Sequence, residues 1–362
     1  MSCESVCPRC GYKSSDLSLM VCPRCGYTII YRCHDVKWSV DNNKASMWRY
    51  TNMFAVRPGS IISAGEGLTP IVKINGVLSK LETRNPTGSY SDRASSFMVS
   101  YLRRKHYIVK YEDDFAYSLT FYAKLDGAGT TIVSAPDDLD PYEIVDIERL
   151  GGSIVFEGIP ELHYENPLAV EGLKTISFEV EEQNPKAEKI YVPSSTGLLA
   201  VSVVEGLREI NRLDSYEVIA VSLKGSRAPA MLPVKDVKLV EIEPEEVMKD
   251  IVKLAEKGIY LKPLSASAYS LASREDLGLA LITGSIRRYL KLKTLSSKLK
   301  DEIIKNLSSQ GPMTAYELWK LMNRYTLRGL YNALRSLEAE GKVCAEYEMK
   351  GARKVKLYRT CN

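Results

Sequence analysis

Four cysteines near the start of the chain form two pairs whose spacing suits a metal ion. The pairs lie in Cys7-Pro-Arg-Cys10 and Cys22-Pro-Arg-Cys25, and each is followed by Gly-Tyr. A CxxC-Gly turn directs two thiolates to one point, and two such turns close a tetrahedral sulfur site. Because all four positions are cysteine, no position is left for a catalytic water. The sequence therefore predicts structural Zn²⁺ in a zinc ribbon over residues 1–35, with rubredoxin-like iron as the alternative metal and Cys33 as a weak alternative ligand.

The composition indicates a globular protein of two or three domains. Hydrophobic residues make up 45% of the 362 residues and charged residues 26%. Four of the eight cysteines lie in the two CxxC pairs, which predicts metal binding rather than disulfides. No apolar run approaches the roughly 18 residues that span a bilayer. We therefore expect a cytoplasmic protein without a membrane partner.

A second group of polar residues lies in the loop Asn85-Pro-Thr-Gly-Ser-Tyr-Ser-Asp-Arg93. Apolar residues at helical spacing follow over residues 93–105, which predicts a helix beginning just after Gly88-Ser89. Backbone N–H groups at the start of a helix attract anions. This loop is therefore a candidate ligand site.

The same loop resembles the cofactor-lysine loop of threonine synthases and related pyridoxal-phosphate (PLP) enzymes. Their pattern is Asn-Pro-Thr-Gly-Ser, an aromatic residue, Lys, Asp and Arg, whereas this chain has Ser91 in place of the lysine. Trp48-Arg-Tyr50 and Gly65-Glu-Gly67 match further family segments in the same order. The resemblance covers roughly residues 1–290. It implies an α/β body of the fold-type-II PLP-enzyme kind, with two lobes, over residues 36–290.

The resemblance also identifies three places where the cofactor cleft has changed. A Schiff base needs a primary amine, which Ser91 lacks. Glu112-Asp-Asp114 replaces a Ser-Gly-Asn loop, and its carboxylates repel a phosphate. The phosphate cradle, 192–197, retains one glycine. We therefore expect no enzyme activity and no PLP. The polar residues of the vestigial cleft are Ser91, Asp92, Arg93, Ser194, Ser195, Thr196 and Thr283. A scaffold role and the sensing of a small metabolite are equally favoured for this cleft.

Strand and helix patterns alternate through the body, as expected for a parallel α/β sheet. The predicted strands are 71–74, 77–82, 107–111, 130–134, 152–156, 189–193, 218–223 and 279–284. The predicted helices are 115–125, 142–150, 197–210 and 245–257.

The C-terminal part, 291–362, has the element order of a winged helix-turn-helix domain. Three helical patterns precede two strands that flank 350–354. Residues 287–362 contain 17 Lys and Arg against 7 Asp and Glu, while the whole chain has a net charge of +4. Such a basic tail domain favours a polyanionic partner. Candidate DNA-binding residues are Thr326, Arg328, Tyr331, Asn332 and Arg335 for the major groove, and Lys350, Arg353 and Lys354 for the phosphates or the minor groove.

These observations predict a DNA-binding transcriptional regulator or chromatin-associated factor that is catalytically inactive, dimerises and can associate with the nucleoid. One alternative is a PLP-dependent threonine synthase or lyase with an atypical active site. Another is a subunit that binds other proteins, because winged helices also serve as protein-binding modules.

Overall fold

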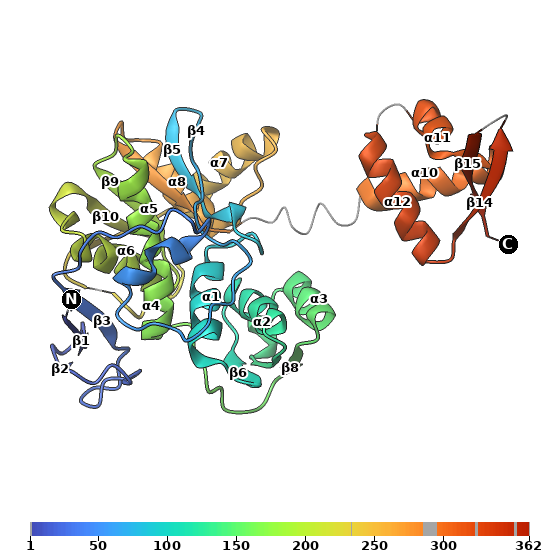
Figure 1. The fold of residues 1–362 in the computed structure, drawn as a ribbon. Helices are drawn as coiled ribbons and strands as arrows, with labels where there is room; N and C mark the ends of the chain where they lie inside the picture. The colour runs from blue at the N-terminus through green and yellow to red at the C-terminus, as the bar shows by residue number, and fades with distance from the viewer. Residues whose placement is uncertain (1, 233, 285–294, 323–324, 351–352, 362) are drawn as a thin grey trace. The chain divides into compact units, whose positions relative to one another are not determined.

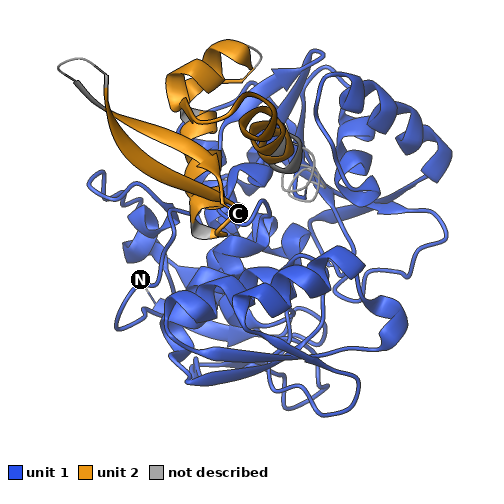
Figure 2. Ribbon diagram, turned by 90° about the vertical axis from the view of Figure 1, so that its right-hand side faces the viewer, with its two compact units in different colours: residues 1–286 blue, residues 287–362 orange. Residues whose placement is uncertain are grey.

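The computed structural model describes residues 2–232, 234–284, 295–322, 325–350 and 353–361. These residues form two compact units, 1–286 and 287–362 (Figure 2). The predicted domain boundary between residues 290 and 291 lies outside the described residues. Among the described residues, no helix combines the length and the apolar character needed to cross a membrane.

Unit 1 begins with a small antiparallel sheet that carries the cysteine pairs. Its strands are β1 (Ser2–Val6), β2 (Lys13–Ser14) and β3 (Ile30–His34), in the order β2-β1-β3. Tyr31 in β3 is fully buried and belongs to the same hydrophobic core as the body. The N-terminal sheet is therefore an integral part of unit 1.

The larger sheet of the body has six strands in the order β11-β10-β9-β12-β5-β4, and all neighbours are parallel except β4 and β5. The strands are β4 (Ile71–Ile74), β5 (Val77–Leu81), β9 (Lys189–Pro193), β10 (Glu217–Leu223), β11 (Val237–Ile242) and β12 (Gly278–Ile282). The central strands β9, β10 and β12 are almost wholly buried, as expected for a parallel sheet covered on both faces.

A second, smaller parallel sheet has the order β6-β7-β8. Its strands are β6 (His106–Lys110), β7 (Gly129–Val133) and β8 (Ser153–Val155). The two sheets define two lobes of unit 1, and Figure 1 shows α2 and α3 beside the smaller one. The predicted βαβ alternation is confirmed, but it serves two sheets.

Helices and short 3₁₀ segments cover these sheets. The α-helices of unit 1 are α1 (Ser91–Leu102), α2 (Phe115–Leu125), α3 (Pro141–Leu150), α4 (Pro167–Leu173), α5 (Thr175–Gln183), α6 (Leu198–Glu209), α7 (Pro244–Glu256) and α8 (Pro263–Ala272). The 3₁₀ segments are η1 (Met47–Met53), η2 (Glu82–Arg84), η3 (Pro136–Asp138) and η4 (Leu213–Ser215). One core cluster includes residues of both lobes, and a second one lies against α7 and α8.

The described residues of unit 2 form three helices and a three-stranded antiparallel sheet. Its elements are α10 (Leu295–Gln310), β13 (Met313–Thr314), α11 (Ala315–Leu321), α12 (Leu327–Ala339), β14 (Val343–Lys350) and β15 (Arg353–Thr360), with strand order β13-β15-β14. Thr314 and Glu317 form a capping box that starts α11. Leu330, Leu334 and Leu337 are buried in the unit's own core.

Candidate functional site

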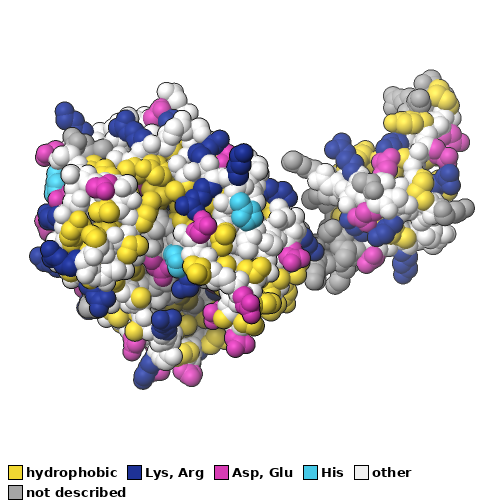
Figure 3. Space-filling view, turned by 90° about the horizontal axis from the view of Figure 1, so that it is seen from below, with side chains coloured by type: hydrophobic (Ala, Val, Ile, Leu, Met, Phe, Trp, Pro, Cys, Tyr) yellow, Lys and Arg dark blue, Asp and Glu magenta, His cyan; other side chains and the backbone are white. Residues whose placement is uncertain are grey.

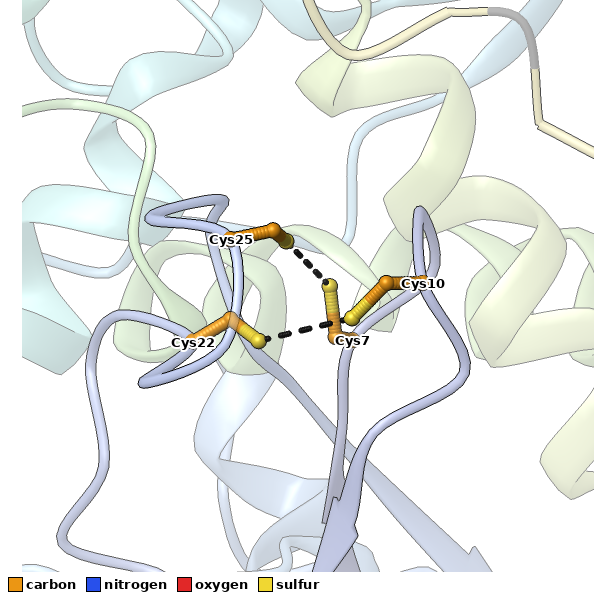
Figure 4. A group of neighbouring side chains, drawn as sticks. All are labelled: Cys7, Cys10, Cys22 and Cys25. Atoms are coloured by element: carbon orange, nitrogen blue, oxygen red, sulfur yellow. Dashed lines mark hydrogen bonds between the residues drawn. The ribbon is translucent and has the colours of Figure 1, made fainter.

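The four cysteines of the N-terminal pairs lie together with a geometry that suits a metal. Their sulfur atoms all lie within 4.8 Å of one another, and the Sγ atoms of Cys7 and Cys25, like those of Cys10 and Cys22, are 3.6 Å apart (Figure 4). A tetrahedral zinc ion with Zn–S bonds of about 2.3 Å needs sulfurs roughly 3.8 Å apart. The four thiols therefore fit Zn²⁺.

Each cysteine pair lies in a tight turn that holds the thiols in place. The Gly11 N–H donates to the carbonyl of Cys7 at 3.0 Å, and the Gly26 N–H donates to the carbonyl of Cys22 at 2.9 Å. Both glycines have a φ near +70°, where a side chain is strained. The repeated Cys-x-x-Cys-Gly sequence thus builds two equivalent turns.

The arginines of the two turns contact the tyrosines that follow the opposite turns. The guanidinium of Arg9 lies 5.6 Å from the ring centre of Tyr27, and that of Arg24 lies 5.8 Å from the ring centre of Tyr12. These are cation–π distances. Each arginine thus connects one cysteine turn to the tyrosine that follows the other turn.

Helix α1 begins at Ser91, within the Asn85–Arg93 motif. The Ser91 side chain is fully buried, and its Oγ has no hydrogen-bond partner within the described residues. An unpaired buried hydroxyl is costly and needs an explanation. Among the predicted cleft residues, Ser91 is therefore a candidate ligand contact.

The side chain of Arg93, in contrast, is buried in the body and forms ion pairs there. Its guanidinium donates to Glu82 at 2.7 and 2.9 Å and to Glu179 at 2.6 and 2.8 Å, and all three side chains are completely buried. The predicted role of Arg93 as a free polar group of the cleft is wrong for this reason: both edges of its guanidinium already bind carboxylates.

The carboxylate of Asp92 also has its hydrogen-bond partners within the protein. It accepts hydrogen bonds from the Thr87 N–H at 2.7 Å, from the Thr87 hydroxyl, and from the Ser118 hydroxyl at 2.7 Å. Burial nevertheless raises the pKa of Asp92 to about 7, because these hydrogen bonds do not fully offset desolvation. The side chain fixes the loop and is not presented to a ligand.

The remaining predicted cleft residues lie at the ends of strands in the larger sheet. Ser194 follows β9, is buried, and has an Oγ without a hydrogen-bond partner in the described part of the chain. The neighbouring Ser195 is exposed, and the carbonyl of Thr196 accepts from the Met231 N–H at 2.8 Å. The Thr283 hydroxyl lies 2.8 Å from that of Ser265.

The acidic loop 112–114 lies between β6 and α2 and reaches these strand ends. The Ser195 hydroxyl lies 3.5 Å from a carboxylate oxygen of Glu112. Lys262 donates to Asp113 at 2.7 Å and to Asp114 at 2.9 Å. The loop thus brings negative charge to the place where the family pattern has a neutral loop.

Replacing Glu112 by glutamine is expected to change how stability depends on pH. Burial raises the pKa of Glu112 to about 7, from an ordinary value of 4.5. The folded state therefore holds a proton that the unfolded chain releases between these values, and the stability that this proton contributes is lost as the pH rises through 7. Denaturant unfolding at pH 4.5 and 7.5 should show that Glu112→Gln becomes more stable relative to the unmodified protein at the higher pH.

The control for this measurement is Glu157→Gln, which changes an exposed glutamate. The difference between the two pH values should be unchanged in that variant. Equal behaviour of the two variants would contradict the role assigned to Glu112.

Two disulfides are features that the sequence analysis did not predict. Cys3 is bonded to Cys33, and Cys344 is bonded to Cys361. The expectation that cysteine serves metal rather than disulfides is therefore correct only for the CxxC pairs, and Cys33 is not a metal ligand here. The pairing of β1 with β3 places Cys3 opposite Cys33, a register that the sequence does not reveal. Disulfides are typical of oxidising compartments and of hyperthermophile proteins.

In unit 2, α12 presents several of the predicted DNA-binding residues. Thr326 caps the helix, and Tyr331, Asn332 and Arg335 are exposed. The side chains of Arg328, Lys350, Arg353 and Lys354 lie outside what the structure describes. On the face drawn in Figure 3, positive and negative side chains are interspersed on each unit.

Comparison with solved structures identifies the fold of the body. The chain is similar to an L-serine ammonia-lyase from Rhizomucor miehei (15% identity, TM-score 0.53, covering 63% of this chain and 99% of that one). It is also similar to the processed form of threonine deaminase isoform 2 from Solanum lycopersicum (16% identity, TM-score 0.50, covering 66% of this chain and 92% of that one). A third neighbour is the O-acetylserine dependent cystathionine beta-synthase from Helicobacter pylori (18% identity, TM-score 0.53, covering 62% of this chain and 95% of that one). The fold is that of the fold-type-II PLP-dependent enzymes. No protein-family model and no curated protein matches the sequence.

These neighbours correct one prediction. We expected a chain without enzyme activity, but all three neighbours are catalytic PLP-dependent enzymes, so the fold points to enzymes. That expectation rested on three local changes, at Ser91, at residues 112–114 and in the cradle 192–197, whereas the fold depends on packing throughout the body. The prediction of a non-enzyme is therefore wrong.

The residues of the cleft do not fit PLP that is held covalently at position 91. Ser91 has no amine, and the carboxylate of Glu112 lies beside Ser195, close to where the cradle would take the phosphate. Burial alone lowers the pKa of Lys262, but Asp114 and Asp113 outweigh this and raise it, which keeps the amine charged and not nucleophilic.

Proposed function

We propose that the protein binds duplex DNA through residues 287–362 and acts as a transcriptional regulator or chromatin-associated factor. The observation that carries the proposal is the two-sided character of α12. Leu330 and Leu334 are buried on one side, while Asn332 and Arg335 are exposed on another. Arginine and asparagine suit the edges of guanine and adenine in the major groove.

The order of elements in unit 2 supports an assignment as a winged helix. A short strand lies between the first two helices, and a hairpin, β14–β15, follows the third. In this assignment α12 is the recognition helix and the hairpin is the wing. Lys350, Arg353 and Lys354 lie at the tip of the wing in the sequence, where basic residues suit phosphates.

The charge of the chain supports the same proposal. Residues 287–362 carry 17 basic and 7 acidic residues, while the complete chain carries 49 and 45. Positive charge concentrated in one domain attracts a polyanion and makes binding depend on salt. We further propose a homodimer, which would present two such domains to DNA, and a small-molecule effector in the cleft of unit 1.

Arg335→Ala is expected to weaken binding to the preferred DNA site about 5- to 150-fold, because a bidentate contact to a base contributes roughly 1–3 kcal/mol. Arg328→Ala should act in the same direction. Lys350→Ala and Lys354→Ala should instead weaken binding to all sequences and reduce its salt dependence. Mobility-shift titrations at several salt concentrations, on sites found by genome-wide crosslinking, measure both effects.

The matched control is Arg274→Ala, an exposed arginine of unit 1 that pairs with Glu246. Its binding curve should match that of the unmodified protein. If all four unit 2 variants bind as the unmodified protein does, the assignment of this surface is wrong. Copurifying proteins without any DNA retention would support the protein-binding alternative.

Amino-acid lyase or synthase chemistry with an atypical active site is the second candidate function. The observation that favours it is the fold of the body, which the chain shares with a serine ammonia-lyase and a threonine deaminase. This function resides in unit 1 and does not compete with DNA binding by unit 2.

The test of this second candidate is incubation of the purified protein with PLP, followed by borohydride reduction and peptide mass spectrometry. A pyridoxyl-lysine adduct on unit 1, together with ammonia release from L-serine or L-threonine, is the expected result. Lys262→Met identifies or eliminates Lys262 as the modified amine. A protein that neither acquires an adduct nor releases ammonia would contradict this candidate.

A further inference from the structure

The acidic loop 112–114 connects the two lobes of unit 1. It follows β6 of the smaller sheet and precedes α2. Its partners belong to the larger lobe: Ser195 follows β9, Lys262 precedes α8, and Gly284 follows β12. Three consecutive acidic residues therefore reach three separate segments of the opposite lobe.

Lys262 is the cation of this connection. Its Nζ lies 2.7 Å from both carboxylate oxygens of Asp113 and 2.9 Å from one of Asp114. The side chains of Lys262 and Asp114 are only 14% and 9% exposed. Partial desolvation strengthens such charge-assisted hydrogen bonds beyond those of exposed pairs. We therefore expect this ion pair to contribute more to stability than the exposed ion pairs on the surface of unit 1.

Asp114 adopts a backbone conformation that is unfavourable for its residue type. Its φ is +66° and its ψ is −34°, in a region that residues other than glycine seldom occupy. Strain of this kind persists only where the surrounding contacts enforce it, and it gathers at sites that switch or bind. The contacts of the Asp114 carboxylate with the opposite lobe are such enforcing contacts.

The other side of Asp114 lies against Gly284. A Cβ atom at position 284 would come within 2.6 Å of a carboxylate oxygen of Asp114. Gly284 is held by Ser265, whose hydroxyl accepts the Gly284 N–H at 2.8 Å, and the Tyr90 N–H donates to the carbonyl of Thr283 at 3.1 Å. Asp114 therefore lies against the segment Thr283–Gly284, and the same segment binds Tyr90 at the beginning of α1, next to Ser91.

We propose that Lys262, Asp113 and Asp114 form a latch that holds the two lobes closed over the start of α1. The strain at Asp114 is released when the ion pair breaks, so the closed state is poised to open. Opening gives a ligand access to the Ser91 hydroxyl, which has no hydrogen-bond partner in the described parts of the chain. The latch is a property of unit 1 and does not depend on DNA binding.

Hydrogen exchange followed by mass spectrometry tests the latch on the full-length chain. Lys262→Met should accelerate exchange about tenfold or more in peptides that contain residues 113–118 and residues 282–284, because it removes several charge-assisted hydrogen bonds. The matched control is Lys189→Met, which removes a lysine that pairs with Glu275 at 2.7 Å within the larger lobe. The control should leave exchange in these peptides unchanged.

Asp114→Gly separates the latch from general destabilisation. This variant removes the carboxylate but relieves the backbone strain, so it should accelerate exchange in the same peptides while the thermal midpoint stays the same or rises. Unchanged exchange in both Lys262→Met and Asp114→Gly would overturn the proposal. So would acceleration that spreads evenly over the whole of unit 1 in Asp114→Gly.

Discussion

Replacing Arg93 by methionine is expected to destabilise unit 1 by about 3–5 kcal/mol, which is the usual cost of removing one partner from a buried ion pair. The loss of packing is small, because methionine fills much of the space of the arginine stem. The main cost arises because Glu82 and Glu179 remain buried without their strongest cation. Denaturant unfolding of the full-length protein measures the change.

Lys80 does not replace the missing charge. It donates to Glu179 at 2.8 Å but lies 4.0 Å from Glu82. Burial alone raises the pKa of Glu179, but Arg93 and Lys80 outweigh it and lower the pKa to about 2. This contribution to stability is complete above the ordinary value of 4.5 and is lost as the pH falls toward 2. Arg93→Met should therefore cost less stability at low pH than at pH 7.

The control is Arg212→Met, which removes an exposed arginine that pairs with Glu181 at 2.7 Å. Pairs of that kind contribute about 0–1 kcal/mol, so this variant should unfold almost like the unmodified protein. If the two variants had equal effects, the Arg93 network would not be an important source of stability.

The location of Arg93 could not be predicted from the sequence. Its loop resembled a cofactor site, and its partners lie 11 and 86 residues away along the chain. Only the folded structure, in which the guanidinium binds Glu82 of η2 and Glu179 of α5, shows that it points inward. Ser91 is two residues earlier and is buried as well, but its hydroxyl has no hydrogen-bond partner among the described residues. Neighbouring residues of one motif thus serve different purposes.

The fold was predictable where periodicity and burial agree. Helix α2 and strand β9 begin and end at the predicted residues, because each has a clear apolar pattern between polar boundaries. Strand β11 was missed because it lies at the edge of the sheet and is largely exposed. Helices α4 and α5 are short and meet at Lys174. Neither contains a periodic apolar pattern long enough to predict a helix from the sequence.

The cysteines show where local pattern is sufficient and where it fails. The four metal-site cysteines follow a short-range rule, and the structure brings them together as that rule requires. The four disulfide cysteines are paired over 30 and 17 residues, so their partners depend on strand register and chain path. The expectation of an inactive body is a similar case, because it rested on three short segments and not on the packing of the whole body.

Cys7→Ser is expected to remove the bound metal and to destabilise unit 1. Metal content measured on the purified full-length chain should fall from about one zinc per chain to almost none, because three sulfur ligands bind zinc much less tightly than four. Metal bound at 1,000 times its Kd stabilises the folded state by about 4 kcal/mol, which is the loss expected under those conditions. Thermal unfolding with and without a chelator measures it.

The loss should reach beyond the N-terminal sheet. Arg32 in β3 donates to Glu205 of α6 at 2.6 and 3.0 Å, and the Tyr27 hydroxyl donates to the carbonyl of Ala230 at 3.0 Å. Because Ile30 and Tyr31 also belong to the body's core, loosening the metal turns exposes apolar surface of the body. The chelator should therefore lower the unfolding midpoint of unit 1 as a whole.

The matched control is the double variant Cys3→Ser, Cys33→Ser, which removes two cysteines from the same sheet but none from the metal site. It should keep its zinc and lose stability only through the missing cross-link, by about 2–5 kcal/mol. Zinc retained by Cys7→Ser, or lost by the double variant, would contradict the ligand assignment. Because the double variant loses stability without losing metal, a protein that is merely unstable can be distinguished from one whose metal site is broken.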